Sequence, residues 1–225
     1  MKITYIGHSG FAAETEKAAL IFDYYTGDIP AFDPDVPLYV FVSHRHRDHF
    51  NPDIFSLRGR PGGVTYILSR DVGSCGGAED IVRVRHGESL DAGPLHIETL
   101  KSTDEGVAFI VALEGRTIYH AGDLNRWVWQ EESREYNIRM AAKYTKQMDI
   151  IRGRHFDIAF VPLDPRQEED REGGLLEFCA ACRAEHIFPM HMWDDYSVIP
   201  AFKAAHPGLA SGIADITHPG QTFEI

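Results

Sequence analysis

The amino-acid sequence predicts an α/β fold built from short buried strands, loops and helices. The segment Leu38–Val42 is an unbroken run of aliphatic and aromatic residues, which is typical of a strand buried on both faces of a sheet. Similar apolar segments recur along the chain and form two strand-rich halves, each closed by helical segments. With 225 residues, 44% of them hydrophobic, the chain can bury one sizeable core. We therefore expect residues 1–225 to form a single α/β domain.

The N-terminal half is predicted to be rich in strands. Met1–Ile6 and Ala18–Asp23 form two expected strands, joined by a turn with a charged tip. Asn51 is a favourable helix N-cap and Pro52 suits the first helical position, so we expect a helix to begin there. Further strands are expected at residues 38–42, 64–69, 81–84 and 95–100.

The C-terminal half is predicted to alternate strands with helices. Residues 107–113 and 116–119 form an expected hairpin-like pair. Residues 124–151 have a helical composition with an aromatic start, where Trp127 and Trp129 either line a pocket or anchor the helix on the sheet. Further strands are expected at residues 156–164, 186–191 and 218–225, and another helix at 173–183.

The charge and the lack of long apolar segments exclude some classes of function. A formal net charge of −12 argues against a nucleic-acid-binding protein, which needs clustered cations. No apolar run approaches the length of a membrane span, and the chain starts directly with a strand-like segment, so we expect no signal peptide and a cytoplasmic location. The sequence leaves open whether the chain forms a homo-oligomer.

The cysteines do not form a recognisable disulfide or metal pattern. Cys75, Cys179 and Cys182 are few and odd in number. Cys179 and Cys182 lie three residues apart on the apolar side of the helix expected at 173–183, so we expect them to be packed in the core. Cys75 lies in a glycine-rich segment that lacks the Gly-Lys-Ser/Thr ending of a phosphate loop.

The segment Ser43–His49 contains three histidines and one carboxylate directly after the apolar run at 38–42. Ligands of α/β proteins bind where buried strands end in loops. Imidazole nitrogens and carboxylate oxygens are ligands that zinc, iron and manganese accept. The alternative, a solvated polar loop, does not require this density of histidine. The segment therefore predicts a metal site.

The pattern His44-x-His46-x-Asp48-His49 after an apolar strand resembles the metal-binding motif of the metallo-β-lactamase-fold hydrolases. The details are most similar to the small single-domain branch that includes the ascorbate-6-phosphate lactonase-like proteins. The resemblance implies a pseudo-duplicated four-layer αβ/βα sandwich, with two mixed β-sheets flanked by helices.

Three further strand ends resemble motifs of this family. Asp23 ends an apolar strand, and the resemblance implies that it hydrogen-bonds a ligand or loop of the site without binding metal. Asp123, in His-Ala-Gly-Asp, resembles the carboxylate that bridges two metals. His120 lies three residues earlier, and strand alternation is expected to turn it to the other face, so we expect it to support the ligands of the site without binding metal. His191, in Pro-Met-His, resembles the ligand of the second metal.

The chain departs from the family at one ligand position. Where the family usually has a third histidine, this chain has residues 101–106, Lys-Ser-Thr-Asp-Glu-Gly. Asp104 is the residue best able to replace it, and a plain turn is the alternative. If Asp104 binds, a dinuclear site results that suits manganese or iron somewhat better. Otherwise a single ion is held by Asp48, His49, Asp123 and His191.

The resemblance implies a metal-bound hydroxide that attacks a carbonyl or phosphoryl centre. We expect one or two divalent ions, with Zn²⁺ first and Mn²⁺ or Fe²⁺ as alternatives, and Asp48 can also orient the attacking water. His44 and His46 would bind the first ion, Asp48, His49 and His191 the second, and Asp123 would bridge them. His8, in a Gly-His-Ser-Gly turn expected at the same sheet edge, is the weaker candidate for a direct role.

The function that these features predict is a metal-dependent hydrolase of a small ester, lactone or phosphodiester. Arg45, Arg47, Arg126 and Arg166 can receive an anionic substrate, or can be surface charges of an acidic chain. The alternatives are a metal-binding protein without turnover and an iron-dependent redox enzyme. The diiron branch of the fold carries Glu where this chain has His46, which disfavours the redox alternative.

Overall fold

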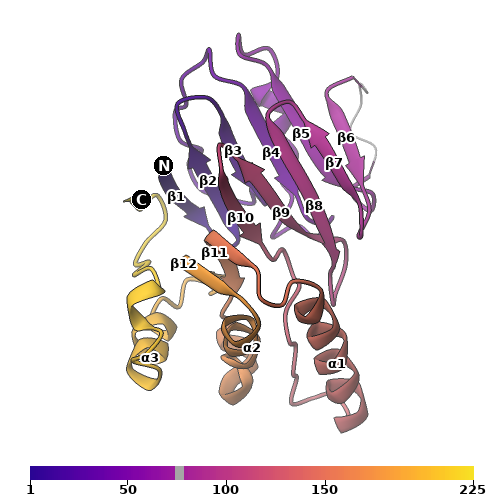
Figure 1. Ribbon diagram of the computed structural model, residues 1–225, viewed down its shortest axis with the longest axis vertical. Helices are drawn as coiled ribbons and strands as arrows, with labels where there is room; N and C mark the ends of the chain where they lie inside the picture. Colours follow the sequence, from indigo (N-terminus) through magenta and orange to yellow (C-terminus); the bar gives the residue numbers. More distant parts are fainter. Residues whose placement is uncertain (74–78) are drawn as a thin grey trace. The chain divides into compact units, whose positions relative to one another are not determined.

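The computed structural model describes residues 1–73 and 79–225 and divides into two compact units. The first unit contains residues 1–85 and 217–225, and the second contains residues 86–216. Each unit has its own mixed β-sheet, and strands β1 to β12 are labelled in Figure 1. These sheets confirm the predicted α/β class with two mixed β-sheets, whereas a single domain over residues 1–225 stays a prediction.

The first unit is organised around a seven-stranded sheet with the order β13-β1-β2-β3-β4-β5-β6. Pairing is antiparallel from β13 to β3 and parallel from β3 to β6. The 3-10 helix η1 (Pro52–Leu57) follows the histidine segment, and its N-cap Asn51 accepts a hydrogen bond from the Asp53 N–H, as the sequence predicts. The strands are β1 (Lys2–Gly7), β2 (Gly10–Glu14), β3 (Ala19–Phe22), β4 (Leu38–Val42), β5 (Val64–Ser69), β6 (Ile81–Val84) and β13 (Thr222–Glu224).

Strand direction in this sheet brings three functional segments to one edge. Because β2 is antiparallel to both β1 and β3, the C-terminal ends of β1, β3 and β4 all lie at the same edge. His8 follows β1, Asp23 follows β3, and Ser43 begins the segment after β4. All five residues of β4 are buried, so the sheet anchors this edge firmly.

The second unit has a six-stranded sheet with the order β12-β11-β10-β9-β8-β7. Strands β10, β11 and β12 are parallel, and antiparallel pairing through β9 gives β8 the same direction. The ends of all four therefore lie at one edge, followed by residues 102–105, 121–123, 163–164 and 191. The strands are β7 (Ser89–Ala92), β8 (Leu95–Lys101), β9 (Val107–Leu113), β10 (Arg116–His120), β11 (His155–Pro162) and β12 (Arg183–Met190).

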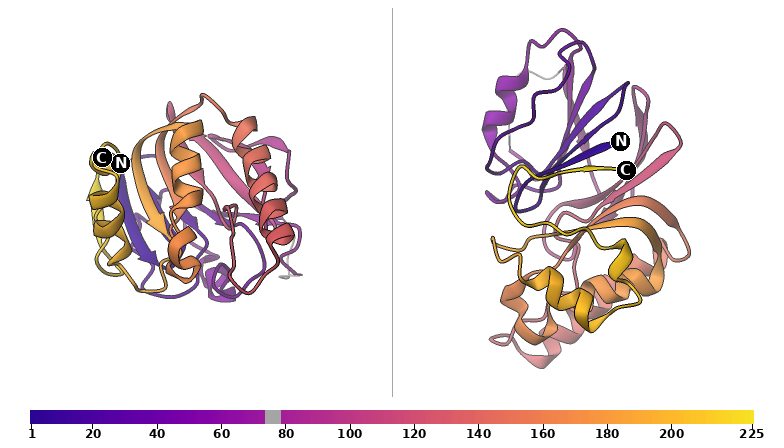
Figure 2. Two further views of the ribbon diagram at one scale, coloured as in Figure 1. Left: turned by 90° about the horizontal axis from the view of Figure 1, so that it is seen from below. Right: turned by 90° about the vertical axis from the view of Figure 1, so that its left-hand side faces the viewer.

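Three α-helices belong to the second unit and lie side by side on one face of its sheet (Figure 2). They are α1 (Arg134–Ile150), α2 (Gly173–Ala181) and α3 (Val198–Ala205), with two short 3-10 helices, η2 (Pro165–Asp170) and η3 (Ala210–Gly212). The expected helix at 124–151 is wrong over its first ten residues. Helix α1 begins only after Ser133, whose hydroxyl accepts a hydrogen bond from the Tyr136 N–H, because this N-cap supplies the start that the preceding aromatic segment lacks.

Two strands were not expected from the sequence. The N-terminal segment forms three strands rather than two, because β2 pairs with both β1 and β3. Strand β7 has the polar sequence Ser-Leu-Asp-Ala and is formed by pairing with β8, as in Ser89 opposite Glu98. Both depend on a neighbouring strand more than on their own hydrophobic pattern.

Two of the three cysteines pack at helix α2, as the sequence predicts. Cys179 is half-buried on α2 and Cys182, directly after the helix, is buried, and burial raises the pKa of each thiol to about 11. Cys75 lies outside the described residues. Among the helices at residues 1–73 and 79–225, none has both the length and the apolar character required to cross a bilayer.

Candidate metal centre

Asp23 is the centre of a buried hydrogen-bond network in the first unit. Its carboxylate accepts hydrogen bonds from the Ser43 N–H (2.7 Å) and from the Ser43 hydroxyl (2.6 Å). It also accepts one from Nδ1 of His49 at 2.7 Å, and all three residues are fully buried. Since Nδ1 donates its proton to Asp23, the lone pair of the ring lies on Nε2. Asp23 therefore holds His49 in the tautomer that can bind a metal ion.

Ser43 extends the same network to His44. The Ser43 hydroxyl donates to Asp23 and therefore accepts from Nδ1 of His44, at 2.9 Å. The Nε2 atom of His44 then faces Nδ1 of His46 at 3.0 Å. Two nitrogens bound to one tetrahedral zinc ion would be separated by roughly 3.3 Å, given Zn–N distances of about 2.0–2.1 Å. His44 and His46 are thus spaced as two ligands of one ion.

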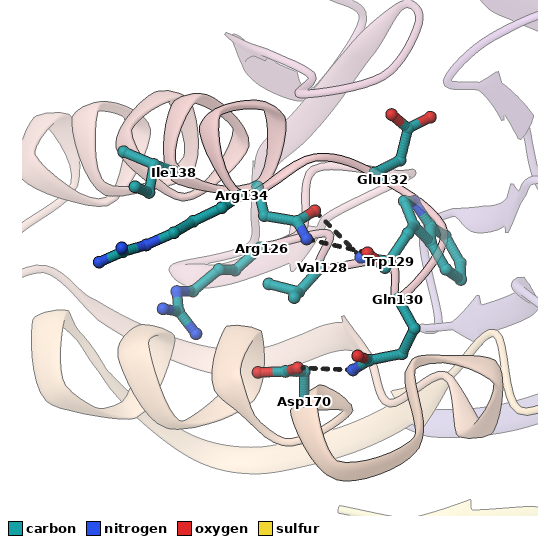
Figure 3. Close-up of a pocket in the computed structure, with 9 residues that line it drawn as sticks. Arg126, Val128, Trp129, Gln130, Glu132, Arg134, Ile138 and Asp170 are labelled. Carbon is teal, nitrogen blue, oxygen red and sulfur yellow. Dashed lines mark hydrogen bonds between the residues drawn. The ribbon is translucent and has the colours of Figure 1, made fainter.

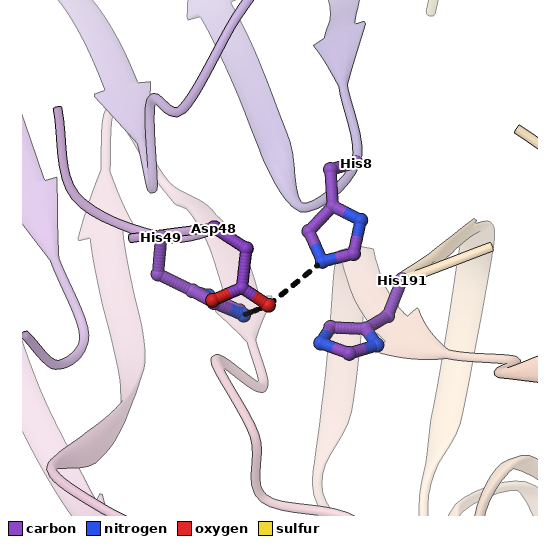
Figure 4. Close-up of side chains that lie close together, drawn as sticks. All are labelled: His8, Asp48, His49 and His191. Atoms are coloured by element: carbon purple, nitrogen blue, oxygen red, sulfur yellow. Dashed lines mark ion pairs between the residues drawn. The ribbon is translucent and has the colours of Figure 1, made fainter. Parts of the chain in front are cut away.

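A second group in the first unit contains His8, Asp48 and His49 (Figure 4). One potential ligand atom from each lies within 4.8 Å of the others. The Asp48 carboxylate lies 3.4 Å from Nε2 of His8 and 4.0 Å from Nε2 of His49. His8, which the sequence made a weaker candidate, is therefore placed beside two predicted ligands.

The second unit builds an analogous carboxylate–histidine pair. His191 follows β12, and its Nδ1 donates to the carboxylate of Asp164, which follows β11, at 2.9 Å. The Nε2 atom of His191 lies 3.5 Å from the carboxylate of Asp123. Burial alone would raise the pKa of Asp164, but hydrogen bonds from His191 and Arg166 outweigh it and hold that pKa below its usual value. Asp164 therefore stays ionised and orients the imidazole.

Asp123 is positioned by contacts to the backbone of its turn. Its carbonyl accepts hydrogen bonds from the Thr103 hydroxyl (3.1 Å) and from the Trp127 indole N–H (3.0 Å). Nδ1 of the buried His120 accepts a hydrogen bond from the Gly122 N–H at 3.1 Å. The left-handed φ of 56° at Gly122 suits glycine and lets the turn fold back on His120. Trp127 thus anchors the turn that carries Asp123.

Asp104 is not brought to the other predicted ligands. Its side chain is exposed, whereas the neighbouring Thr103 is the residue that contacts the Asp123 turn. In the described part of the chain, Asp104 belongs to no group of three or more potential metal ligands. Among the described residues, Asp104 therefore does not take the place of the third histidine that the family usually has.

Left-handed backbone conformations occur at several candidate residues. The φ angles are 53° at His8, 44° at Asp23, 63° at His191 and 51° at Trp193. Such conformations cost a non-glycine residue about 1–3 kcal/mol and persist only where the surroundings enforce them. Backbone strain is thus concentrated at the sheet edges that carry the candidate ligands.

Asp164 is the residue that sequence reasoning missed. The signal was present, because Asp164 ends an apolar strand as Asp23 does, and each lies beside a parallel strand that delivers a histidine.

A cavity of about 370 Å³ in the second unit is lined by Arg126 and Trp129 among other residues (Figure 3). No candidate metal ligand lines this cavity.

The donor atoms fit a divalent metal ion. They are imidazole nitrogens and carboxylate oxygens, which borderline ions such as Zn²⁺ accept. Metal-bound histidines almost always donate their other ring N–H to a carboxylate, a carbonyl or water. His49 and His191 both show this arrangement.

Comparison with known proteins gives a consistent family and fold. A family profile described as "Beta-lactamase superfamily domain" matches residues 2–138. A relative from Desulforamulus reducens, named "UPF0173 metal-dependent hydrolase", is 25% identical over the full length of both chains. Another of that name from Methanosarcina barkeri is 32% identical over 55% of this chain and 61% of its own length.

Two solved structures show the same fold. Igni18, a metallo hydrolase from the archaeon Ignicoccus hospitalis, superposes with a TM-score of 0.66 at 21% identity, covering 100% of this chain and 98% of its own. YhfI from Bacillus subtilis, described as a metallo-β-lactamase fold protein, has a TM-score of 0.61 at 16% identity and covers 99% of both chains.

Proposed function

Because the chain belongs to the β-lactamase superfamily, we propose that it is a metal-dependent hydrolase of a small ester, lactone or phosphodiester. The observation that carries this proposal is the pair of carboxylate–imidazole contacts, Asp23 with His49 and Asp164 with His191. Each contact fixes the tautomer in which Nε2 is available to a metal ion. The relatives named as metal-dependent hydrolases support the same assignment.

We propose a centre of two ions with the ligand set that the sequence motifs imply. The spacings of 3.0 Å between His44 and His46 and 3.5 Å between Asp123 and His191 support a role for each pair. Asp104 lacks such support, so we expect the ion at His44 to bind more weakly. The proposed ligands are His44, His46 and Asp123 for one ion, and Asp48, His49, His191 and Asp123 for the other.

Divalent ions, with Zn²⁺ as our first choice, would lower the pKa of a coordinated water to about 7 and polarise the carbonyl or phosphoryl oxygen of the substrate. The side chains of the protein orient the attacking water and the ligand nitrogens. Asp48 is 24% exposed beside His49, so its carboxylate can hold a water by hydrogen bonding. Buried His44 and His49 keep the ligand nitrogens away from bulk solvent. A small anionic substrate and a cytoplasmic location remain predictions from the sequence.

The test combines metal content with turnover. His49→Ala and His191→Ala are each expected to lose bound metal and at least about tenfold in kcat/KM on a panel of lactones and phosphodiesters. His96→Ala is the matched control, because His96 makes a similar 2.7 Å contact with Asp91 at an exposed site. Full metal content without turnover of any panel member would instead favour a metal-binding protein. Bound iron with oxygen-dependent oxidation would favour the redox alternative.

A further inference from the structure

Arg166 is held between two indole rings at the carboxyl end of β11. Its guanidinium carbon lies 4.5 Å from the ring centre of Trp193 and 5.5 Å from that of Trp129. These are cation–π distances. The Arg166 side chain is 47% exposed and Trp193 is 43% exposed. The cluster is therefore a fixed cation that solvent and solutes can reach.

The local sequence Asp164-Pro165-Arg166 sets the position of this arginine. The Asp164 carboxylate caps the 3-10 helix η2 by accepting the Arg166 N–H at 2.9 Å. It also accepts hydrogen bonds from Nε of Arg166 at 3.0 Å and from Nη2 at 2.5 Å. Pro165 fixes φ at the first helical position, so the arginine folds back onto the carboxylate. Little rotamer entropy remains to be lost when Arg166 binds a ligand.

The same carboxylate connects Arg166 to a proposed metal ligand. Asp164 Oδ2 accepts hydrogen bonds from both Arg166 and Nδ1 of His191. Trp193 follows His191 by two residues, and the centres of their rings are 5.7 Å apart. The cation is thus separated from His191 by a single carboxylate. A small molecule with one group bound to Arg166 would therefore be able to place another of its groups beside His191.

Trp129 is equally fixed. Its ring stacks on that of Trp127, with an interplanar angle of 8° and centres 5.5 Å apart. Its backbone N–H donates to the Asn137 side chain at 3.1 Å, and its carbonyl accepts from the same amide at 2.8 Å. Trp129 therefore presents a rigid apolar face to the guanidinium of Arg166. This face shields one side of the guanidinium from water, which strengthens the attraction of the guanidinium for an anion.

Arg166 retains donors beyond those used by Asp164. A guanidinium has five N–H groups. Among the described residues, Asp164 accepts hydrogen bonds from Nε and from Nη2 of Arg166. The two N–H groups of Nη1 and the second of Nη2 remain for a ligand. Two donors on one planar edge suit the paired oxygens of a carboxylate or phosphate.

We propose that Arg166 is the residue that selects the substrate, by binding a carboxylate or phosphate group that the substrate carries in addition to the bond that is hydrolysed. This assignment rests on the proposed hydrolase function and narrows it to small substrates with a separate anionic group. Arg166 lies beyond the bond-breaking machinery, so its contribution is to binding and orientation.

The test compares two lactones that differ only in the charged group: 5-oxotetrahydrofuran-2-carboxylate and γ-valerolactone, in which methyl replaces the carboxylate. The metal-loaded wild-type protein is expected to prefer the carboxylate by about 10- to 100-fold in kcat/KM, the range given by one charge-assisted hydrogen-bonded pair. Arg166→Gln is expected to lose this preference through KM, and Arg166→Lys to recover part of it. Arg139→Gln, an exposed arginine of α1, is the matched control.

Two results for the Arg166→Gln variant would overturn the assignment. An equal loss on both lactones in Arg166→Gln would mean that Arg166 only supports Asp164. An unchanged preference would mean that another residue selects the anion. Binding provides a readout that does not need turnover, because a bound carboxylate should change the fluorescence of the tryptophans stacked on Arg166. A saturable change that disappears in Arg166→Gln, without turnover by the wild type, would sustain the anion site and reject the hydrolase function. If neither binding nor turnover distinguishes the lactones, the anion site is rejected.

Discussion

Replacing Asp23 by asparagine tests the role of the buried carboxylate with minimal change in shape. Asp23 accepts three short hydrogen bonds, two from Ser43 and one from Nδ1 of His49. An asparagine amide keeps one acceptor for the Ser43 N–H but turns an N–H group toward His49. The imidazole must then accept at Nδ1 and carry its proton on Nε2, which is the wrong tautomer for metal binding.

The expected size of the effect follows from these contacts. Loss of an oriented carboxylate behind a metal-bound histidine typically weakens metal binding by about 10- to 100-fold. Hydrogen bonds to a buried charge contribute about 1.5–3 kcal/mol to the free energy of unfolding, which for a chain of this size corresponds to a fall of roughly 3–12 °C in Tm. We therefore expect Asp23→Asn to fold and to bind zinc weakly.

The assay is the zinc dissociation constant, measured by competition with a chromogenic chelator, together with thermal unfolding of the metal-free protein. Asp91→Asn is the control, because Asp91 contacts His96 at the same 2.7 Å distance on the surface. Zinc affinity within twofold of the wild type in Asp23→Asn would refute the reasoning, and so would an equal loss in the control.

Three further predictions concern stability. Burial raises the pKa of Tyr66 to about 12, so this tyrosine should contribute to a loss of stability between about pH 10 and pH 12, measured by urea unfolding, and Tyr66→Phe should show a smaller loss than the wild type. The hydrogen bond from Arg154 lowers the pKa of the half-exposed Glu98, so Glu98→Gln should cost under about 1 kcal/mol at pH 7, and this difference should disappear as the pH falls and Glu98 becomes protonated in the folded protein. Gly174→Ala should cost about 1–3 kcal/mol, because its Cβ would lie 1.8 Å from the Asn125 amide oxygen.

Each of these predictions has a contradicting result. A Tyr66→Phe protein with the same alkaline loss as the wild type would assign that loss to another group. A constant difference for Glu98→Gln from pH 7 to pH 3 would exclude its titration as the cause. Gly208→Ala is the control for Gly174→Ala, because nothing lies within 4 Å of its added Cβ, and equal effects would exclude steric overlap.

Strands with continuous apolar sequence could be located from the sequence alone. Residues 38–42, 64–69 and 107–113 were expected as strands, and β4, β5 and β9 have these bounds. Residues buried on both faces of a sheet form a continuous apolar run, and such a run is enough to indicate a strand. Strand β7, Ser89–Ala92, could not be found this way, because it exists through its pairing with β8.

The site was predictable where its residues are close in the sequence. The motif His44 to His49 needs only one loop after one strand, and local spacing is enough to identify it. His8 and Asp164 instead depend on which strands run in the same direction and end at the same edge. That order results from long-range pairing, which residue patterns within one segment do not encode.

The central claim is that Nε2 of His49 and Nε2 of His191, each oriented by a buried carboxylate, bind metal. Anomalous diffraction from crystals of the zinc-loaded protein, recorded on both sides of the zinc absorption edge, tests this most directly. We expect an anomalous peak about 2.0–2.1 Å from each of these two nitrogens. Full zinc occupancy at other positions, with neither nitrogen bonded to an ion, would contradict the account.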